Sequence, residues 1–363
     1  MEKLFNTAGP NIPEDSYTID PLSRFDLDEI LTLIRQKRYF VLHAPRHSGK
    51  TSCMLSLCDY LNKVDDYIAV YANVEAGQAM RNNVDSVIQS TCNTLAKQFQ
   101  MVVGNDLPII LRDEAIQENA ALMLYTYLSH LSQKLSKPIV LIVEGYDTLE
   151  KDALFSVFRQ IRSGYANRPA NFPQTVILCG VRDVRDYRIV PSNQDGYTVG
   201  SVFNINAVSL HLENFTKEEI HELYMQHTRK TEQEFDEACF PLVWDATEGQ
   251  PWLVNALAYE VTYNMRENLD RSVRIIPEMI DQAIENIILR RDSHINHVLG
   301  LLNEPKVKRI ILPIVAHEGI VDPSIPKDDI DYCIENGLLT KERCKQLRIS
   351  NGIYKELVIK TYK

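Results

Sequence analysis

Short apolar runs alternate with longer segments of helical periodicity through the first two hundred residues. The apolar runs predict strands within four stretches, which are 38–44, 67–75, 137–149 and 174–190. Helices are predicted around 79–100 and 118–135, and another begins after Lys50 with apolar residues at helical spacing. Strands that alternate with helices indicate an α/β fold with a parallel sheet covered by helices on both faces.

The pattern becomes helical after about residue 212. The stretch LENFTKEEIHELYMQHT predicts a helix with a capping box, in which Thr216 is the N-cap and Glu219 follows three residues later. The last sixty residues predict a helix, a second helix that ends at Gly337, a short wing strand and a closing helix, which is the order of a winged-helix domain. We therefore divide the chain into a core at 1–212, a helical segment at 213–300 and a winged-helix domain at 301–363.

Composition adds limits to this picture. The chain has 363 residues, of which 45% are hydrophobic and 24% charged, as in an ordinary globular protein of two or three domains. We find no secretory signal pattern and no apolar run of the roughly 18 residues that span a bilayer, so we expect a cytoplasmic protein with no membrane partner. Seven scattered cysteines without a C-x-x-C pair are expected to be reduced and structural.

Charge bears on the choice of macromolecular partner. The net charge of -10 opposes nonspecific binding to nucleic acid. In the predicted winged-helix domain, the helix that would enter a DNA groove carries four acidic residues, Asp328, Asp329, Asp331 and Glu335. Since phosphates would repel that face, we do not expect DNA to be a partner. We favour contact with protein, or packing of this domain on the core of its own chain.

The stretch HAPRHSGKTS, at 43–52, lies between a predicted strand and a predicted helix. It matches the phosphate-binding loop G-x-x-x-x-G-K-[ST], with Ala44 in place of the first glycine. In this context, free N–H groups and the positive end of the helix dipole point at a phosphate. Lys50 is then expected to bind the β- and γ-phosphates, and Thr51 a Mg²⁺ ion. The predicted nucleotide-binding residues of the loop are Ala44, Pro45, Arg46, His47, Ser48, Gly49, Lys50, Thr51 and Ser52.

A second apolar strand ends in a carboxylate at Glu144, which we predict to help hold the Mg²⁺ ion. An Asp-Glu pair is the commonest arrangement at this point, but here Gly145 follows Glu144, and the next acid is Asp147. The strand that closes on Gly180 is followed by Arg182, a candidate sensor of the γ-phosphate. Arg185 and Arg188 either face a neighbouring molecule or are solvated arginines.

Four stretches together resemble bacterial AAA-like ATP-binding proteins of the AAA+/STAND group. They are FNTAGPNIPEDSYTIDPLSRFDLDEILTLI (5–34), HAPRHSGKTS (43–52), VRDVRDYRI (181–189) and WDATEGQPWLVNALA (244–258). The resemblance covers most of residues 5–300. It implies that Tyr17 to Arg24 closes over adenine and that 213–300 is a lid, whose turn at Pro251 either touches the base or only opens a buried helix. The E-G-Y-D arrangement resembles the D-G-x-D variant of STAND ATPases, which implies that Asp147 takes part in hydrolysis.

We therefore hypothesise an ATP- and Mg²⁺-binding ATPase that acts as a molecular switch with slow hydrolysis. A protein partner or self-association is expected through the lid and the winged helix. The alternatives are a nucleotide-dependent scaffold without turnover and a DNA-associated ATPase. His294 and His297 lie three residues apart on a predicted helix, and we favour a solvated helix face over a metal site for them.

Overall fold

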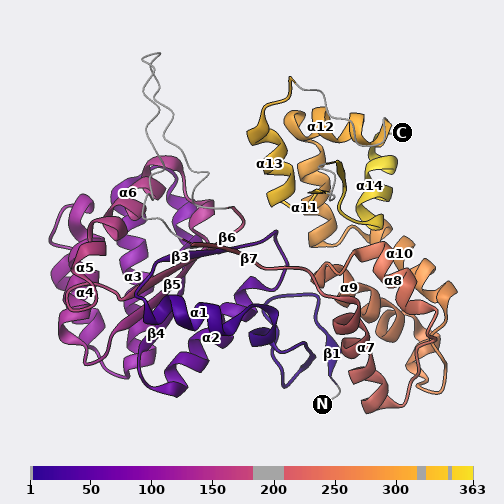
Figure 1. The fold of residues 1–363 in the computed structure, drawn as a ribbon, viewed down its shortest axis with the longest axis horizontal. Coiled ribbons are helices and arrows are strands. Elements are labelled where there is room, and N and C mark those ends of the chain that lie inside the picture. The colour runs from indigo at the N-terminus through magenta and orange to yellow at the C-terminus, as the bar shows by residue number, and fades with distance from the viewer. Residues whose placement is uncertain (1–2, 183–207, 317–323, 342–345, 363) are drawn as a thin grey trace. The chain divides into compact units, whose positions relative to one another are not determined.

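The computed structural model describes residues 3–182, 208–316, 324–341 and 346–362 (Figure 1). The chain forms two compact units. The sheet unit consists of Leu22–His43 and Lys50–Leu212, and the helical unit consists of Met1–Pro21, Ala44–Gly49 and Glu213–Lys363. The loop 44–49 therefore belongs to the helical unit, although it connects two elements of the sheet unit.

The sheet unit is built on a parallel sheet, as the alternating pattern predicts, and β7 is a fifth strand in addition to the four that were predicted. Its strands are ordered β4 (Ile68–Asn73), β5 (Ile139–Glu144), β6 (Thr175–Gly180), β3 (Phe40–His43) and β7 (Val208–His211). The register pairs Asn73 with Glu144 and His43 with Gly180. Because every strand runs in the same direction, the residues that follow the strands lie along one edge of the sheet.

Helices cover the sheet on both faces. They are α1 (Leu27–Arg35), α2 (Lys50–Val64), α3 (Val84–Val103), α4 (Leu107–Ala115), α5 (Ala120–Lys134) and α6 (Lys151–Ser163). Short helical turns lie at η1 (Pro21–Arg24), η2 (Glu75–Met80), η3 (Tyr146–Thr148) and η4 (Tyr165–Asn167). Alternate strand residues, among them Val70, Leu141 and Leu178, form one apolar core with α3, α5 and α6. Helix α2 packs against β4, β5 and β6, and its buried Met54 and Leu57 are not part of that core, which places α2 on the other face. The predicted α/β fold is thus confirmed, and α4 is a helix that the sequence pattern did not predict.

The helical unit begins with a parallel pair of short strands, β1 (Leu4–Phe5) and β2 (Ser16–Tyr17). Its first helices are α7 (Lys217–Thr231), α8 (Cys239–Thr247), α9 (Pro251–Tyr259) and α10 (Pro277–Arg290), with the turns η6 (Glu260–Asn264) and η7 (Arg266–Leu269) after α9. The C-terminal elements are α11 (Ser293–Leu302), α12 (Pro305–Ala316), α13 (Lys327–Glu335), the antiparallel strands β8 (Leu339–Lys341) and β9 (Leu347–Ile349), and α14 (Gly352–Tyr362). The predicted capping box is present at the start of α7, between Thr216 and Glu219.

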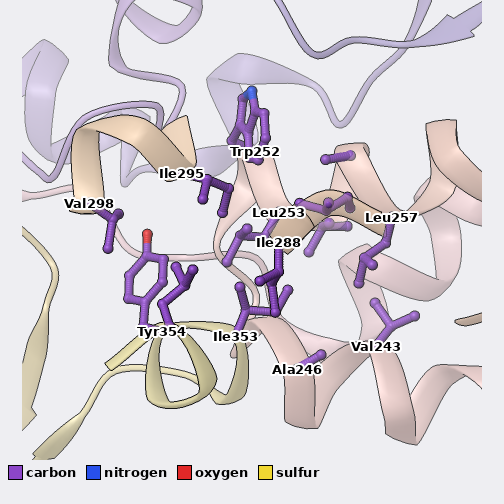
Figure 2. Close-up of a cluster of buried hydrophobic side chains, with 14 of the residues drawn as sticks. Val243, Ala246, Trp252, Leu253, Leu257, Ile288, Ile295, Val298, Ile353 and Tyr354 are labelled. Carbon is purple, nitrogen blue, oxygen red and sulfur yellow. The ribbon is translucent and has the colours of Figure 1, made fainter. Parts of the chain in front are cut away.

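One apolar core joins helices α7 to α10 to the C-terminal elements. Figure 2 shows part of it, in which Leu253 and Leu257 of α9 lie near Ile288 of α10, and Ile353 of α14 completes the cluster. Residues on both sides of position 300 therefore contribute to the same core. The described cysteines are all buried and free, as expected. Among the described helices, none has the length and apolar character needed to cross a membrane.

Candidate functional site

The loop 44–49 leaves β3 and leads directly into α2, which begins at Lys50. His47 and Gly49 both have positive φ angles, of +61° and +93°. Ala44 is fully buried, which is consistent with a small side chain at the position where the motif has its first glycine. The predicted strand, loop and helix are therefore confirmed as elements in that order.

The buried hydroxyl of Ser48 indicates whether the loop 44–49 could bind a phosphate group. The Oγ atom of Ser48 is buried and has no hydrogen-bond partner among the described residues. Lys50 at the first turn of α2 is also buried, with 7% of its surface exposed. A phosphate oxygen at a helix N-terminus would accept a hydrogen bond from such a hydroxyl and pair with such an ammonium group. The residues present thus fit a phosphate group.

The two predicted magnesium ligands lie together in the structure. The Thr51 hydroxyl of α2 is 2.8 Å from Oε1 and 3.0 Å from Oε2 of Glu144, at the end of β5. A hydroxyl and a carboxylate at this separation supply the oxygen ligands that Mg²⁺ prefers. Among the described residues there is no cluster of three or more His, Cys, Asp or Glu side chains that could hold a metal ion. A Mg²⁺ ion at Thr51 and Glu144 would therefore need a further ligand, such as a phosphate.

Tyr71 of β4 is a third member of this group, and the sequence analysis missed it. Its hydroxyl donates a hydrogen bond to Oε2 of Glu144 at 2.5 Å. Burial, and then the nearby carboxylate of Glu144, raise the pKa of Tyr71 well above its ordinary value, so its hydroxyl remains a donor. The signal in the sequence was a hydroxyl-bearing side chain inside an otherwise apolar strand, since such a group needs a polar partner when buried.

Asp147 and Arg182 lie near the carboxyl end of β6. The backbone N–H of Val181 donates to Oδ2 of Asp147 at 2.9 Å, and the Tyr146 hydroxyl donates to the carbonyl of Arg182 at 3.1 Å. These bonds fasten η3 to the end of β6. Arg185 and Arg188, which were expected either to face a neighbouring molecule or to be solvated, lie outside the described residues.

Gly145 occupies the position where the commonest motif has a second acid. Its φ angle is +78°, and a Cβ atom placed on it would lie 2.5 Å from Oδ1 of Asn73. An acidic side chain at this position would be strained by the left-handed backbone and would overlap Asn73. The departure from the motif is therefore a consequence of the backbone path between β5 and η3.

The loop 44–49 makes its side-chain contacts with α11 and α9 inside the helical unit. The Nδ1 atom of His47 lies 2.7 Å from Nδ1 of His294, and the Gln250 side-chain amide donates to the carbonyl of His47 at 3.3 Å. His294 also pairs through Nε2 with the Tyr354 hydroxyl at 2.7 Å. Its side chain is 2% exposed, so the expectation of a solvated face was wrong for this residue. Burial, with His47 as the next cause, lowers the pKa of His294 well below its ordinary value.

The turn at 249–252 opens α9. Gly249 has a φ of +73°, and a Cβ atom on it would lie 1.9 Å from the carbonyl oxygen of Phe215. The Gln250 side chain caps the helix by accepting from the N–H of Leu253 at 2.7 Å, and Pro251 stands in the first turn. The alternative of a buried helix-opening turn therefore describes Pro251, and its contact with a base stays a prediction.

Tyr17, predicted to close over adenine, is buried in the helical unit. Its ring packs on Phe5, with centroids 4.8 Å apart, and its hydroxyl lies 3.2 Å from Nδ1 of His227. The neighbouring Thr18 exchanges two backbone hydrogen bonds with the Gln226 side chain. The segment before α1 is therefore anchored to α7 at Tyr17 and Thr18.

Comparisons with known proteins bear on the fold and the family of the chain. The Walker-type ATPase Paby2304 of Pyrococcus abyssi shares 14% sequence identity, with coverage of 98% of this chain and 99% of that chain, and superposes with a TM-score of 0.60. Cdc6p from Pyrobaculum aerophilum, at 14% identity and 93% and 91% coverage, has a TM-score of 0.49. The RuvB Holliday junction branch migration motor of Thermotoga maritima, at 13% identity and 90% coverage of both chains, has a TM-score of 0.43. A search of curated proteins finds no match.

The likeness to Paby2304 extends over nearly the whole of both chains and shows that they share a fold. The model of the AAA-like domain family matches residues 23–322, which is most of the sequence. This range includes the loop 44–49, Thr51, Glu144 and the helices α7 to α11. The chain therefore belongs to the AAA-like domain family of P-loop ATPases.

Proposed function

We propose that this protein binds ATP with Mg²⁺, hydrolyses it slowly and acts as a nucleotide-dependent switch. The observation that carries the proposal is the contact of Thr51 with Glu144 at the start of α2. The loop just before it holds the buried Ser48 hydroxyl, which has no hydrogen-bond partner in the described part of the chain. This arrangement offers oxygen ligands for a metal ion and donors for phosphate oxygens within one short stretch of chain.

Each residue then has a separate task. Lys50 pairs with the β- and γ-phosphates, and Ser48 donates to a phosphate oxygen. Thr51 and Glu144 would hold the Mg²⁺ ion. When bound, the ion would draw charge away from the phosphates and so favour attack by water. Arg182 is proposed as the residue that senses the γ-phosphate.

The switch is supported by the contacts of the loop. The residues just before Lys50 contact α11 through His47, and contact α9 through Gln250. A Cβ atom on Gly337 would lie 2.8 Å from Cγ of Pro45, so the end of α13 also approaches the loop. A change in the loop on nucleotide binding would therefore act directly on the helices of its own unit, because a close-packed interior does not deform gradually.

The output of the switch is proposed to be a protein contact through the C-terminal elements. Helices α12, α13 and α14 with the β8–β9 pair have the order of a winged-helix domain. Asp329 on α13 pairs with Arg309, and Asp331 with Lys341. An acidic helix disfavours DNA phosphates and favours a basic protein surface or a second copy of the chain. Membership of the STAND subgroup belongs to the same proposal.

A titration with fluorescent ATP tests the nucleotide site. Lys50→Ala is expected to lose ATP affinity by roughly 100-fold or more, since a buried charge-assisted contact with phosphate is removed. Lys63→Ala, near the C-terminal end of the same helix, is the matched control and should bind as the wild type does. Unchanged affinity of the Lys50→Ala variant would contradict the proposal, and tight binding without any phosphate release would identify the non-hydrolysing scaffold instead.

A further inference from the structure

The position that Gly145 leaves without an acid lies beside Glu75, which follows the neighbouring strand β4. The β4–β5 ladder continues past the register pair Asn73 and Glu144, because the N–H of Val74 donates to the carbonyl of Glu144 at 2.9 Å. The next residue along the chain is Glu75, the first residue of η2. Glu75 is therefore brought alongside Gly145 by backbone hydrogen bonds.

The distance between the two positions is short. A Cβ atom built on Gly145 would lie 3.1 Å from the Cβ atom of Glu75 and 3.1 Å from its backbone nitrogen. The Cβ atom of Glu75 therefore lies close to the position that the Cβ atom of an acidic residue at 145 would take. The side chain of Asn73 fixes the backbone of Glu75, since its Oδ1 accepts from the Glu75 N–H at 2.8 Å.

We propose that Glu75 supplies the carboxylate that polarises the attacking water, in place of the acid that Gly145 cannot carry. The inference rests on the proposed ATPase function and names a residue for its hydrolytic step. Glu75 is exposed, so its carboxylate can reach solvent water.

The step is a hydrolysis. The Glu75 carboxylate accepts a hydrogen bond from a water molecule and orients its oxygen toward the γ-phosphorus of ATP. As the new oxygen–phosphorus bond forms, the bond from that phosphorus to the bridging oxygen breaks, and its electron pair stays on ADP. One proton of the water passes to Glu75 and then to solvent, and the products are ADP and inorganic phosphate.

Asp147, the residue implied by the STAND resemblance, is the competing candidate. Its Oδ2 atom accepts the N–H of Val181 at 2.9 Å, which gives it a role in holding η3 against β6. An asparagine oxygen at the same position could accept the same bond. Asp147→Asn is therefore expected to keep most of the turnover.

The test compares four variants of the full chain, Glu75→Gln, Glu75→Asp, Asp147→Asn and Glu118→Gln. Glu118 is an exposed residue between α4 and α5 and serves as the matched control. Fluorescent ATP titration measures affinity, single-turnover phosphate release measures hydrolysis, and chromatography identifies the nucleotide retained after incubation. We expect Glu75→Gln to bind ATP within about threefold of the wild type, to release phosphate roughly 100-fold more slowly, and to retain ATP rather than ADP. Glu75→Asp should recover part of the rate.

The outcomes separate this inference from the function on which it rests. If Glu75→Gln releases phosphate within about threefold of the wild-type rate, or if Asp147→Asn alone stops turnover, the role of Glu75 is refuted while the ATPase function stands. If wild-type protein binds ATP but releases no phosphate above the Lys50→Ala background, both hydrolysis and the role of Glu75 are refuted. If the wild type does not bind ATP, the proposed function itself fails.

Discussion

His47 and His294 face each other through their Nδ1 atoms at 2.7 Å, although 247 positions separate them in the sequence. Only one of these two atoms can carry the shared proton, so the contact requires that at least one imidazole be neutral. His294 is the buried partner, and its Nε2 atom pairs with the Tyr354 hydroxyl of α14. The phosphate loop is thereby connected through one side chain to the last helix of the chain.

The neutral state of His294 predicts an acid-sensitive stability. Its pKa is lowered in the folded protein by burial and by His47, so below about pH 6.5 the unfolded chain binds more protons than the folded one. Stability from this residue is fully present above about pH 7.5 and falls as the pH drops, by up to about 1.4 kcal/mol per pH unit. Denaturant unfolding at pH 7.5, 6.5 and 5.5 should show a smaller loss for His294→Gln than for the wild type. The variant His221→Gln, at a half-buried histidine, is the control, and equal losses in wild type and His294→Gln would contradict the assignment.

Removal of the Tyr71 hydroxyl should weaken the metal site without removing it. In Tyr71→Phe, the Glu144 carboxylate loses one donor and keeps the Thr51 hydroxyl, so its orientation is less restricted. A hydrogen bond to a charged group contributes about 1.5 kcal/mol or more, which corresponds to roughly tenfold. We expect the Mg²⁺ concentration needed for half-maximal ATP binding to rise by up to about tenfold. Tyr67→Phe, just before β4, is the control, and an unchanged Mg²⁺ requirement in Tyr71→Phe would show that its hydroxyl does not position Glu144.

Substitution of Gly145 by alanine should lower the stability of the protein more than the same substitution at Gly104, which has a similar backbone conformation. Gly104 has a φ of +74° and would place a Cβ atom in open space, with nothing within 4 Å, whereas a Cβ atom on Gly145 would lie 2.5 Å from Asn73. Both substitutions carry the left-handed backbone cost of about 1–2 kcal/mol. Gly145→Ala is expected to lose a further 1–3 kcal/mol, roughly, through overlap with its neighbours. Denaturant unfolding of both variants checks this, and equal destabilisation would mean that the crowding at Gly145 relaxes without cost.

Local patterns were sufficient to predict a parallel sheet and the loop that follows β3. Strand β3, the loop and α2 are consecutive in the sequence, so the apolar run, the glycine and the helical periodicity after Lys50 together predict their order. Glu144 could be found for the same reason, because it is the first acid after a buried strand. Each of these inferences depends on neighbours within about ten positions of chain.

Which residues lie next to these elements was determined by the tertiary structure. Tyr71 lies beside Glu144, and Glu75 lies beside Gly145, only because β4 pairs with β5 in one register. Nothing in the sequence of either strand predicts that register. The sequence alone left Gly145 as an unexplained departure from the motif. In the structure, a positive φ and the Asn73 side chain account for it.

The largest difference between sequence and structure is at the histidine of α11. A pair of histidines three residues apart, among polar neighbours, is typical of an exposed helix face, and the sequence contains no sign that His47 and Tyr354 would cover one of them. The loop sequence alone was sufficient to predict a phosphate-binding turn, because such a turn is built from consecutive backbone groups. The partners of His294 come from segments near the two ends of the chain, and only the packing of the helical unit brings them to the same point.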